Sequence, residues 1–189
     1  TLIVLAHPLS DSLAAHFARQ IVQHFDEAGQ QVQLLDLYQQ DYDPRLSKQE
    51  RAGYYQTDFD DIADLAQQER LILVFPTWWF GLPAILKGWI DRSFLPGVAY
   101  DHASDLSALS PRLSNLRDVL VVTSLGSPAW IDWLVLRRPV RRSLKWGLFK
   151  ACAPRARFSM LSLYQAESVS KARLAKFETR LRRTLESMS

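Results

Sequence analysis

Cysteine is nearly absent from the 189-residue sequence, in which Cys152 is the only one. A disulfide within the chain is therefore excluded, and so is a zinc site that needs several cysteine ligands. The sequence also lacks the GxGxxG and GxxxxGK[ST] patterns of dinucleotide-binding and phosphate-binding loops. It has neither an HExxH pair nor a GxSxG serine, so a metal centre or a hydrolase is not predicted.

Long uncharged runs are scarce as well, and the longest covers residues 71–86. It is shorter than the ~20 residues of a membrane-spanning helix, and Pro76, Gly81 and Pro83 interrupt it. We therefore interpret it as a buried strand, a loop and the start of a helix. Residues 1–6 carry no basic leader, so we expect no secretory signal. We predict a cytoplasmic protein, with peripheral association at the inner face of the membrane as an option.

Charge is distributed unevenly along the chain. Residues 1–95 hold 7 basic and 13 acidic side chains, whereas residues 96–189 hold 16 basic and 7 acidic ones. A nucleic-acid surface is one interpretation, but no nucleic-acid motif accompanies it, and we expect no such partner. The other is a solvated helix face that touches acidic partners or anionic lipid. The basic residues concerned are Arg137, Arg138, Arg141, Arg142, Lys145, Lys150, Arg155 and Arg157.

Short apolar runs alternate with segments of helical periodicity. Strands are predicted at 2–6, 31–37, 71–75, 118–124 and 157–164. Helices are predicted at 12–28, 60–69, 83–94, 129–151 (interrupted by Pro139) and 169–186, with a short helix capped by Ser47 through Glu50. This order predicts an α/β fold, a flavodoxin-like doubly wound five-stranded parallel sheet with helices on both faces. We expect residues 1–189 to form a single domain.

Ligands of such a sheet bind outside the carboxyl ends of the strands. The loops in question are residues 7–12, 76–83 and 123–130. The first ends in Ser10, Asp11 and Ser12 at a helix start, where hydroxyl groups and free amides suit a phosphate. Plain N-capping by Ser10 or Asp11 is an equally good interpretation.

The second loop holds three consecutive aromatic residues, Trp78, Trp79 and Phe80. Three neighbouring rings cannot all enter one core, so at least one is expected to line a cleft for a planar ring. Gly81 would let the backbone approach that ring closely. The alternative is a contact with another domain or subunit.

Several stretches resemble the NAD(P)H:quinone oxidoreductase family. They are IVLAHP at 3–8, followed by Ser12 and Leu13, then FPTWWFGLPAILKGWIDRSF at 75–94, and VAYDH at 98–102. The resemblance implies bound FMN, or alternatively FAD, with NAD(P)H as electron donor and a quinone or similar planar molecule as acceptor. It also implies a ping-pong cycle and a homodimer, which we expect to form through the helix that begins at Pro83, near Gly88 and Trp89.

The resemblance assigns roles residue by residue. The phosphate end is assigned to His7, Ser10, Ser12, Leu13 and Ala14. The isoalloxazine ring is flanked by Pro76, Thr77, Trp78, Trp79 and Phe80. Its polar edge is contacted by Thr123, Ser124, Leu125 and Gly126. The catalytic candidates are Trp130 and, over the substrate and often from the other subunit, Tyr100 and His102.

Three departures distinguish this chain from the family's usual pattern. An asparagine expected near Ala14 is missing, and Thr-Ser-Leu-Gly at 123–126 stands where the family has TTGG. No histidine follows that loop, and Trp130 is its nearest aromatic residue. Two other functions suit the same predicted fold, a flavodoxin-like electron carrier and a regulatory subunit or sensor that docks on a membrane transporter. The basic C-terminal half argues against the carrier.

Overall fold

The computed structural model describes residues 1–55, 65–102 and 109–188. Its main sheet has five parallel strands in the order β2-β1-β3-β6-β7. The sheet order and the parallel pairing confirm the predicted doubly wound α/β fold. The strands are β1 (Leu2–Leu5), β2 (Gln33–Asp36), β3 (Arg70–Pro76), β6 (Asp118–Leu125) and β7 (Arg157–Tyr164).

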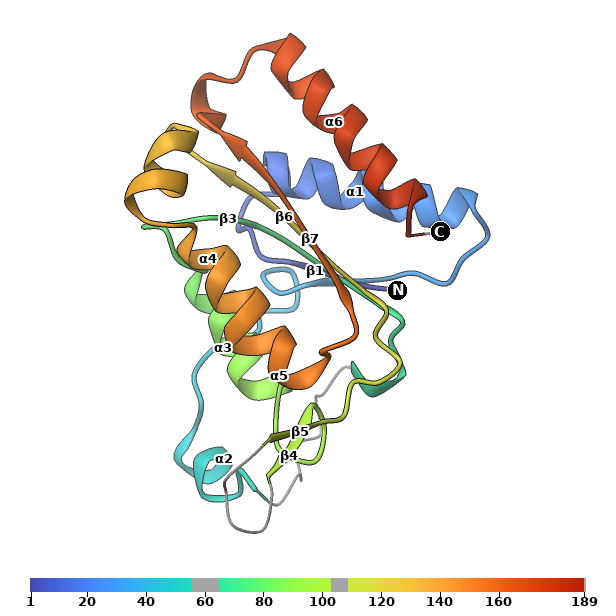
Figure 1. The fold of residues 1–189 in the computed structure, drawn as a ribbon, viewed down its shortest axis with the longest axis vertical. Coiled ribbons are helices and arrows are strands. Elements are labelled where there is room, and N and C mark those ends of the chain that lie inside the picture. The colour runs from blue at the N-terminus through green and yellow to red at the C-terminus, as the bar shows by residue number, and fades with distance from the viewer. Residues whose placement is uncertain (56–64, 103–108, 189) are drawn as a thin grey trace.

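Helices cover both faces of the sheet, as Figure 1 shows. One face carries α1 (Leu13–Glu27) and α6 (Lys171–Glu186). The other face carries α3 (Ala84–Ser93), α4 (Pro139–Arg142) and α5 (Lys150–Cys152). The short helix α2 (Lys48–Ala52) lies at the lower end of the view, beside β4 (Tyr100–His102) and β5 (Leu109–Pro111).

The core is divided by the sheet, because successive strand residues face opposite sides. Leu2 and Val4 of β1 belong to the core shared with α3, which includes the fully buried Trp89. Ile3 and Leu5 belong to the core shared with α1 and α6. Both faces of the central strands β1, β3 and β6 are therefore closed to water, which explains why these strands are nearly continuous apolar runs.

Helix α1 follows its sequence pattern closely. Phe17, Ile21 and Phe25 recur every four residues and are all buried. The Ser12 side chain accepts the amide of Ala15, so Ser12 is the N-cap rather than Ser10 or Asp11. The predicted cap of α2 is confirmed too, since Ser47 and Glu50 form a reciprocal capping box.

The helix predicted over 129–151 is more broken than Pro139 alone suggested. Its pieces are, in chain order, the π-helical segment Ile131–Val135, α4, the π-helical segment Ser143–Phe149 and α5. Arg137 and Arg138, which precede Pro139, both have a φ of 55°. A residue before proline is disfavoured in the right-handed helical region, so the chain leaves the helix there.

Two further expectations need correction. Of the predicted helix 60–69, Leu65–Gln67 forms a single 3₁₀ turn, and residues 60–64 lie outside the described part. Tyr100 and His102 fall in none of the predicted strands, but they form the two ends of β4, which pairs antiparallel with β5. In the described ranges, no helix combines the length and apolar character needed to cross a bilayer.

The structure does not support the expected dimer contact near Gly88 and Trp89. A contact with a second subunit needs these residues at the surface, yet both are buried within this chain. A Cβ atom on Gly88 would overlap the backbone of Pro44. The close contact between Gly88 and Pro44 explains why this position has no side chain, and it requires no second subunit.

Candidate functional site

The loops after β3 and β6 are tied together at the carboxyl edge of the sheet. The amide of Thr77 donates to the carbonyl of Ser124 over 2.9 Å. The hydroxyl groups of Thr77 and Thr123 lie 2.8 Å apart, within hydrogen-bond distance. Thr123 is fully buried, so this pair fixes one loop against the other.

The aromatic loop is a tight and strained turn. Trp78 and Gly81 exchange two backbone hydrogen bonds of 3.2 and 2.8 Å. The two residues between them, Trp79 and Phe80, have φ angles of 49° and 56°. This two-residue hairpin geometry normally selects asparagine and glycine, because other side chains pay a steric cost at positive φ. Trp79 is fully exposed, so packing does not compensate the steric cost at that residue, and such strain gathers at functional sites.

The rings of this turn face outward. Trp79 is 100% exposed and Trp78 is 45% exposed. The His7 ring, from the loop after β1, lies 6.4 Å from the Trp78 ring at a tilt of 58°. All three loops therefore meet at one edge, as predicted from the order of the strands.

His7 is held by its own loop. The amide of Leu9 donates to His7 Nδ1 over 3.0 Å. Burial lowers the pKa of His7, and the negative charge of the nearby Asp11 opposes this effect. A neutral imidazole whose Nδ1 accepts a hydrogen bond carries its proton on Nε2. His7 can thus offer a donor to a ligand at this edge.

The start of α1 offers further donors. Helix geometry leaves the amides of the first turn, at Leu13 and Ala14, without acceptors inside the helix. Arg19 also reaches this loop, with its Nη1 2.9 Å from the carbonyl oxygen of Ser10. The sequence reasoning missed Arg19, because it sits on the second turn of α1 and not in a loop. Amides at a helix N-terminus together with a nearby guanidinium suit an anion.

The loop after β6 leaves one polar atom unsatisfied. Ser127 Oγ is buried and has no hydrogen-bond partner among the described residues. Gly126 is exposed, and a Cβ atom there would lie 3.3 Å from Glu167 Oε1. Leu125, which replaces a glycine of the family pattern, is buried as the last residue of β6.

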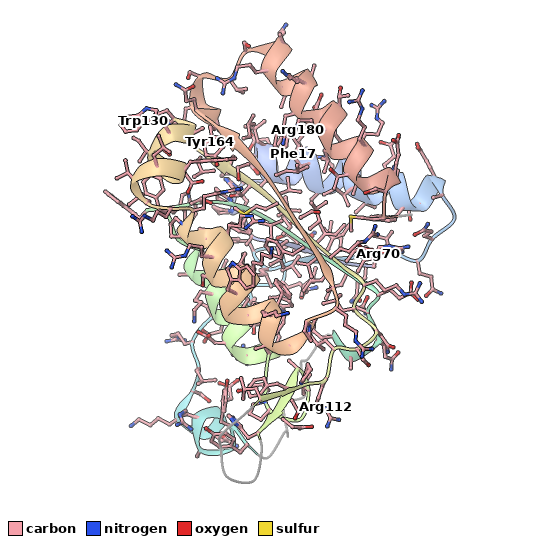
Figure 2. The ribbon with its side chains drawn as sticks, in the orientation of Figure 1. Phe17, Arg70, Arg112, Trp130, Tyr164 and Arg180 are labelled. Carbon is pink, nitrogen blue, oxygen red and sulfur yellow. The ribbon has the colours of Figure 1, made fainter. Side chains whose placement is uncertain are left out.

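Trp130 follows this loop and is exposed at the same end of the sheet. Figure 2 shows it close to Tyr164, the last residue of β7. Tyr164 donates to Asp132 Oδ2 over 2.7 Å, and the indole of Trp133 donates to the Tyr164 hydroxyl over 2.8 Å. The sequence reasoning missed this network, because its members are about thirty residues apart.

Tyr100 and His102 are not brought to the three loops within one chain. Their rings are 5.2 Å apart, and His102 also lies 5.8 Å from the ring of Tyr55. In Figure 1 the β4–β5 hairpin lies at the lower end of the molecule, whereas β6 and β7 end at the upper left. Burial and the neighbouring Tyr54 raise the pKa of Tyr100.

The chain was compared with known proteins. The family described as "flavodoxin-like fold" matches residues 1–183. The chain belongs to this family. A similar solved structure, Smu.1420 from Streptococcus mutans UA159, has a TM-score of 0.83 and 26% identity, with 98% of each chain covered.

Two curated relatives match part of this chain at higher sequence identity. An uncharacterized NAD(P)H oxidoreductase of Escherichia coli K12, YcaK, is 37% identical over 111 residues, which cover 55% of this chain and 57% of the relative. NAD(P)H dehydrogenase [quinone] 1 of Cavia porcellus is 31% identical over 148 residues, which cover 67% of this chain and 53% of the relative. The matches span about half of these relatives. They confirm the resemblance to NAD(P)H:quinone oxidoreductases.

Proposed function

We propose that the protein is a flavin-dependent NAD(P)H dehydrogenase that passes two electrons to quinones or similar planar acceptors. The observation that carries this proposal is the strained aromatic turn at Trp79 and Phe80, fixed beside His7 and tied through Thr77 to the neighbouring loop. The names of the relatives support the choice of donor and acceptor.

The residues at this edge fit a flavin. The amides of Leu13 and Ala14 and the guanidinium of Arg19 would hold the phosphate. Trp78 would lie along the ring, and Ser127 Oγ would find a partner in one of the ring's polar atoms. One helix N-terminus with a single nearby arginine favours one phosphate group, and we therefore propose FMN rather than FAD.

A bound flavin supplies the redox chemistry, and the chain's task is to bind, orient and exclude. Thr77 and Thr123 hold the two loops at a fixed separation. His7 Nε2–H is a donor that stays neutral near pH 7, since burial lowers its pKa. Trp79 is exposed beside the proposed site, so donor and acceptor would reach the same surface in turn, and we expect ping-pong kinetics.

The two remaining catalytic candidates require a second copy of the chain. Tyr100 and His102 lie on β4, at the end of the molecule away from the three loops. We propose a homodimer in which this hairpin reaches the partner's loops. Trp130, by contrast, lies at the edge that its own chain provides.

A flavin titration tests the proposal. Purified protein mixed with FMN or FAD is expected to quench flavin fluorescence with micromolar or tighter affinity, and to sustain multiple turnovers of NADH or NADPH oxidation only when a quinone is added. Thr123→Val, which breaks the Thr77 pair, is expected to weaken flavin binding several-fold. Thr179→Val on the exposed face of α6 is the matched control and leaves binding unchanged. Protein that binds no flavin at micromolar concentration would refute the proposal.

We also propose that residues 1–189 form one domain. Both cores share a single sheet, and Met188, which follows α6, is buried in the core that α1 and α6 form with this sheet. A single cooperative unfolding transition, with one midpoint, would agree with this organisation.

A further inference from the structure

The β4–β5 hairpin, at the lower end of Figure 1, has one aromatic face. His102 lies opposite Leu109, and Tyr100 lies opposite Pro111. Directly opposed residues of an antiparallel pair share a face, whereas the intervening Asp101 lies on the other face. The two catalytic candidates therefore stand on the same side of the hairpin, together with the side chains of β5 that oppose them.

Tyr55 extends this aromatic face from outside the hairpin. It follows α2 in the chain, and its ring lies 5.8 Å from the His102 ring at a tilt of 57°. The Tyr100 ring lies 5.2 Å from the same His102 ring, edge to face. Rings at these separations are in contact. Tyr55, His102 and Tyr100 are therefore joined through His102 into one group, which we call the aromatic row.

The members of the aromatic row differ in exposure. Tyr55 is 62% exposed, and Leu109 beside His102 is 45% exposed. Tyr100 is half-buried and packs against the core on the α3 side of the sheet. Burial raises the pKa of the Tyr100 hydroxyl, and a hydrogen bond with the neighbouring Tyr54 adds to this effect. Tyr100 therefore anchors the row, whereas Tyr55 is the ring that projects from it.

We infer that Tyr55 is a specificity-determining residue for the electron acceptor and acts across the proposed homodimer. The inference rests on the proposed function, in which the β4–β5 hairpin reaches the partner's loops. A hairpin that brings His102 to those loops also brings Tyr55, because the two rings are in contact. The exposed ring of Tyr55 then lies against the bound acceptor.

The length of the aromatic row favours acceptors with more than one fused ring. Its neighbouring ring centres are 5.2 and 5.8 Å apart, so the row is longer than a single six-membered ring. A benzoquinone held at His102 ends short of Tyr55, whereas the second ring of a naphthoquinone reaches it. Contact between two aromatic rings stabilises binding beyond the area that it buries. The row therefore selects naphthoquinones over benzoquinones.

Quinone binding to the oxidised, FMN-loaded protein tests the inference without turnover. The probes are dimethylnaphthoquinone and duroquinone, its counterpart with a single ring, and the change in flavin absorbance gives each dissociation constant. Tyr55→Ala is expected to raise the constant for dimethylnaphthoquinone about threefold to tenfold, and that for duroquinone less than twofold. Tyr55→Phe keeps the ring and should retain both constants. Leu34→Ala, which truncates an exposed side chain of β2, is the control and should also retain both.

A mixed dimer tests whether Tyr55 acts across the interface. Chains with Tyr55→Ala and chains with Ser12→Asp are co-expressed with different tags and purified together. Aspartate preserves the N-cap of α1 but brings a carboxylate to the proposed phosphate end, so the Tyr55→Ala chain alone retains FMN. That flavin faces the partner subunit's Tyr55, which is intact. The constant for dimethylnaphthoquinone is therefore expected to return to the parental value.

Four results would overturn the inference. An unchanged constant for dimethylnaphthoquinone in Tyr55→Ala, with FMN bound and reduced as in the parent, would exclude Tyr55 and leave the proposed function intact. An equal rise for both quinones would contradict its role in specificity, and an equal rise in Leu34→Ala would show that the effect is not local. A raised constant that persists in the mixed dimer would exclude action across subunits. Protein that binds no FMN would instead refute the proposed function, and the inference with it.

Discussion

Single residues at the carboxyl edge carry strain that their contacts do not compensate. Trp79 adopts a φ of 49° with its side chain fully exposed. A left-handed conformation costs an ordinary residue about 1–2 kcal/mol, and a ring in water recovers none of it by burial. A ligand in contact with the exposed ring would account for a tryptophan at this position, as the proposed flavin site requires.

Trp79→Asn tests this explanation. Asparagine tolerates the left-handed region, so the variant is expected to raise the free energy of unfolding by about 1 kcal/mol. Flavin binding is expected to weaken several-fold, because a stacking ring is lost. Urea unfolding and flavin titration measure the two effects. A variant that is less stable than the parent would show that the turn is not strained as described.

His7 gives a prediction about pH. Burial lowers its pKa below the ordinary 6.5, so the unfolded chain takes up the proton more readily than the folded one. The stability due to neutral His7 is complete above about pH 6.5 and is lost as the pH falls through the lower pKa of the folded state. His7→Gln is therefore expected to flatten the loss of stability between about pH 7 and pH 5. An NMR titration of the imidazole at or above 6.5 would contradict it.

At this scale the sequence predicted which loops matter but not every residue within them. Ser12, Thr77 and Trp78 stand in loops that follow strands, where composition is informative. Arg19 and Tyr164 stand in a helix and at a strand end, and only the folded chain brings them to the edge.

Among the elements, α3 depends on a contact that no local pattern encodes. Gly88 lies against Pro44, from a segment that precedes α2. Gly147, in Ser143–Phe149, has open space around the position of a Cβ atom. Close packing therefore requires a glycine at position 88, whereas position 147 has room for a side chain.

Gly88→Ala and Gly147→Ala form a matched pair. Gly88→Ala is expected to lower the free energy of unfolding by about 1–3 kcal/mol, because the new methyl group would displace the backbone at Pro44. Gly147→Ala is expected to leave it unchanged or raise it by up to about 1 kcal/mol, since alanine favours helical conformations. Urea midpoints measure both. Equal effects of the two substitutions would contradict the packing described for α3.

Helix and strand periodicity predicted the elements that build the layers. The central strands β1, β3 and β6 are buried apolar runs, and the long helices α1 and α6 each have a regular apolar stripe. The broken segment 129–151 and the β4–β5 hairpin were not predicted. Their conformations depend on Arg137 and Arg138 before a proline and on the pairing of residues 100–102 with 109–111.

For the whole molecule, the separation of β4 from the three loops leads to a prediction about assembly. If Tyr100 and His102 serve the proposed site, the protein is a dimer at micromolar concentration in sedimentation equilibrium. His102→Ala is then expected to raise the acceptor KM with flavin content intact, because acceptor binding is weakened equally in the ground and transition states. A strictly monomeric protein would exclude both residues from the site.

The central claim is that this sheet edge binds a flavin that NAD(P)H reduces and a quinone reoxidises. An anaerobic absorbance experiment tests it most directly, with NADPH or NADH added to FMN-loaded protein and a quinone added afterwards. We predict that the flavin absorbance bleaches with one equivalent of nicotinamide and returns with one equivalent of quinone, with no third component present. Flavin that stays oxidised with both nicotinamides, or that bleaches but is not restored by any quinone, would contradict the account.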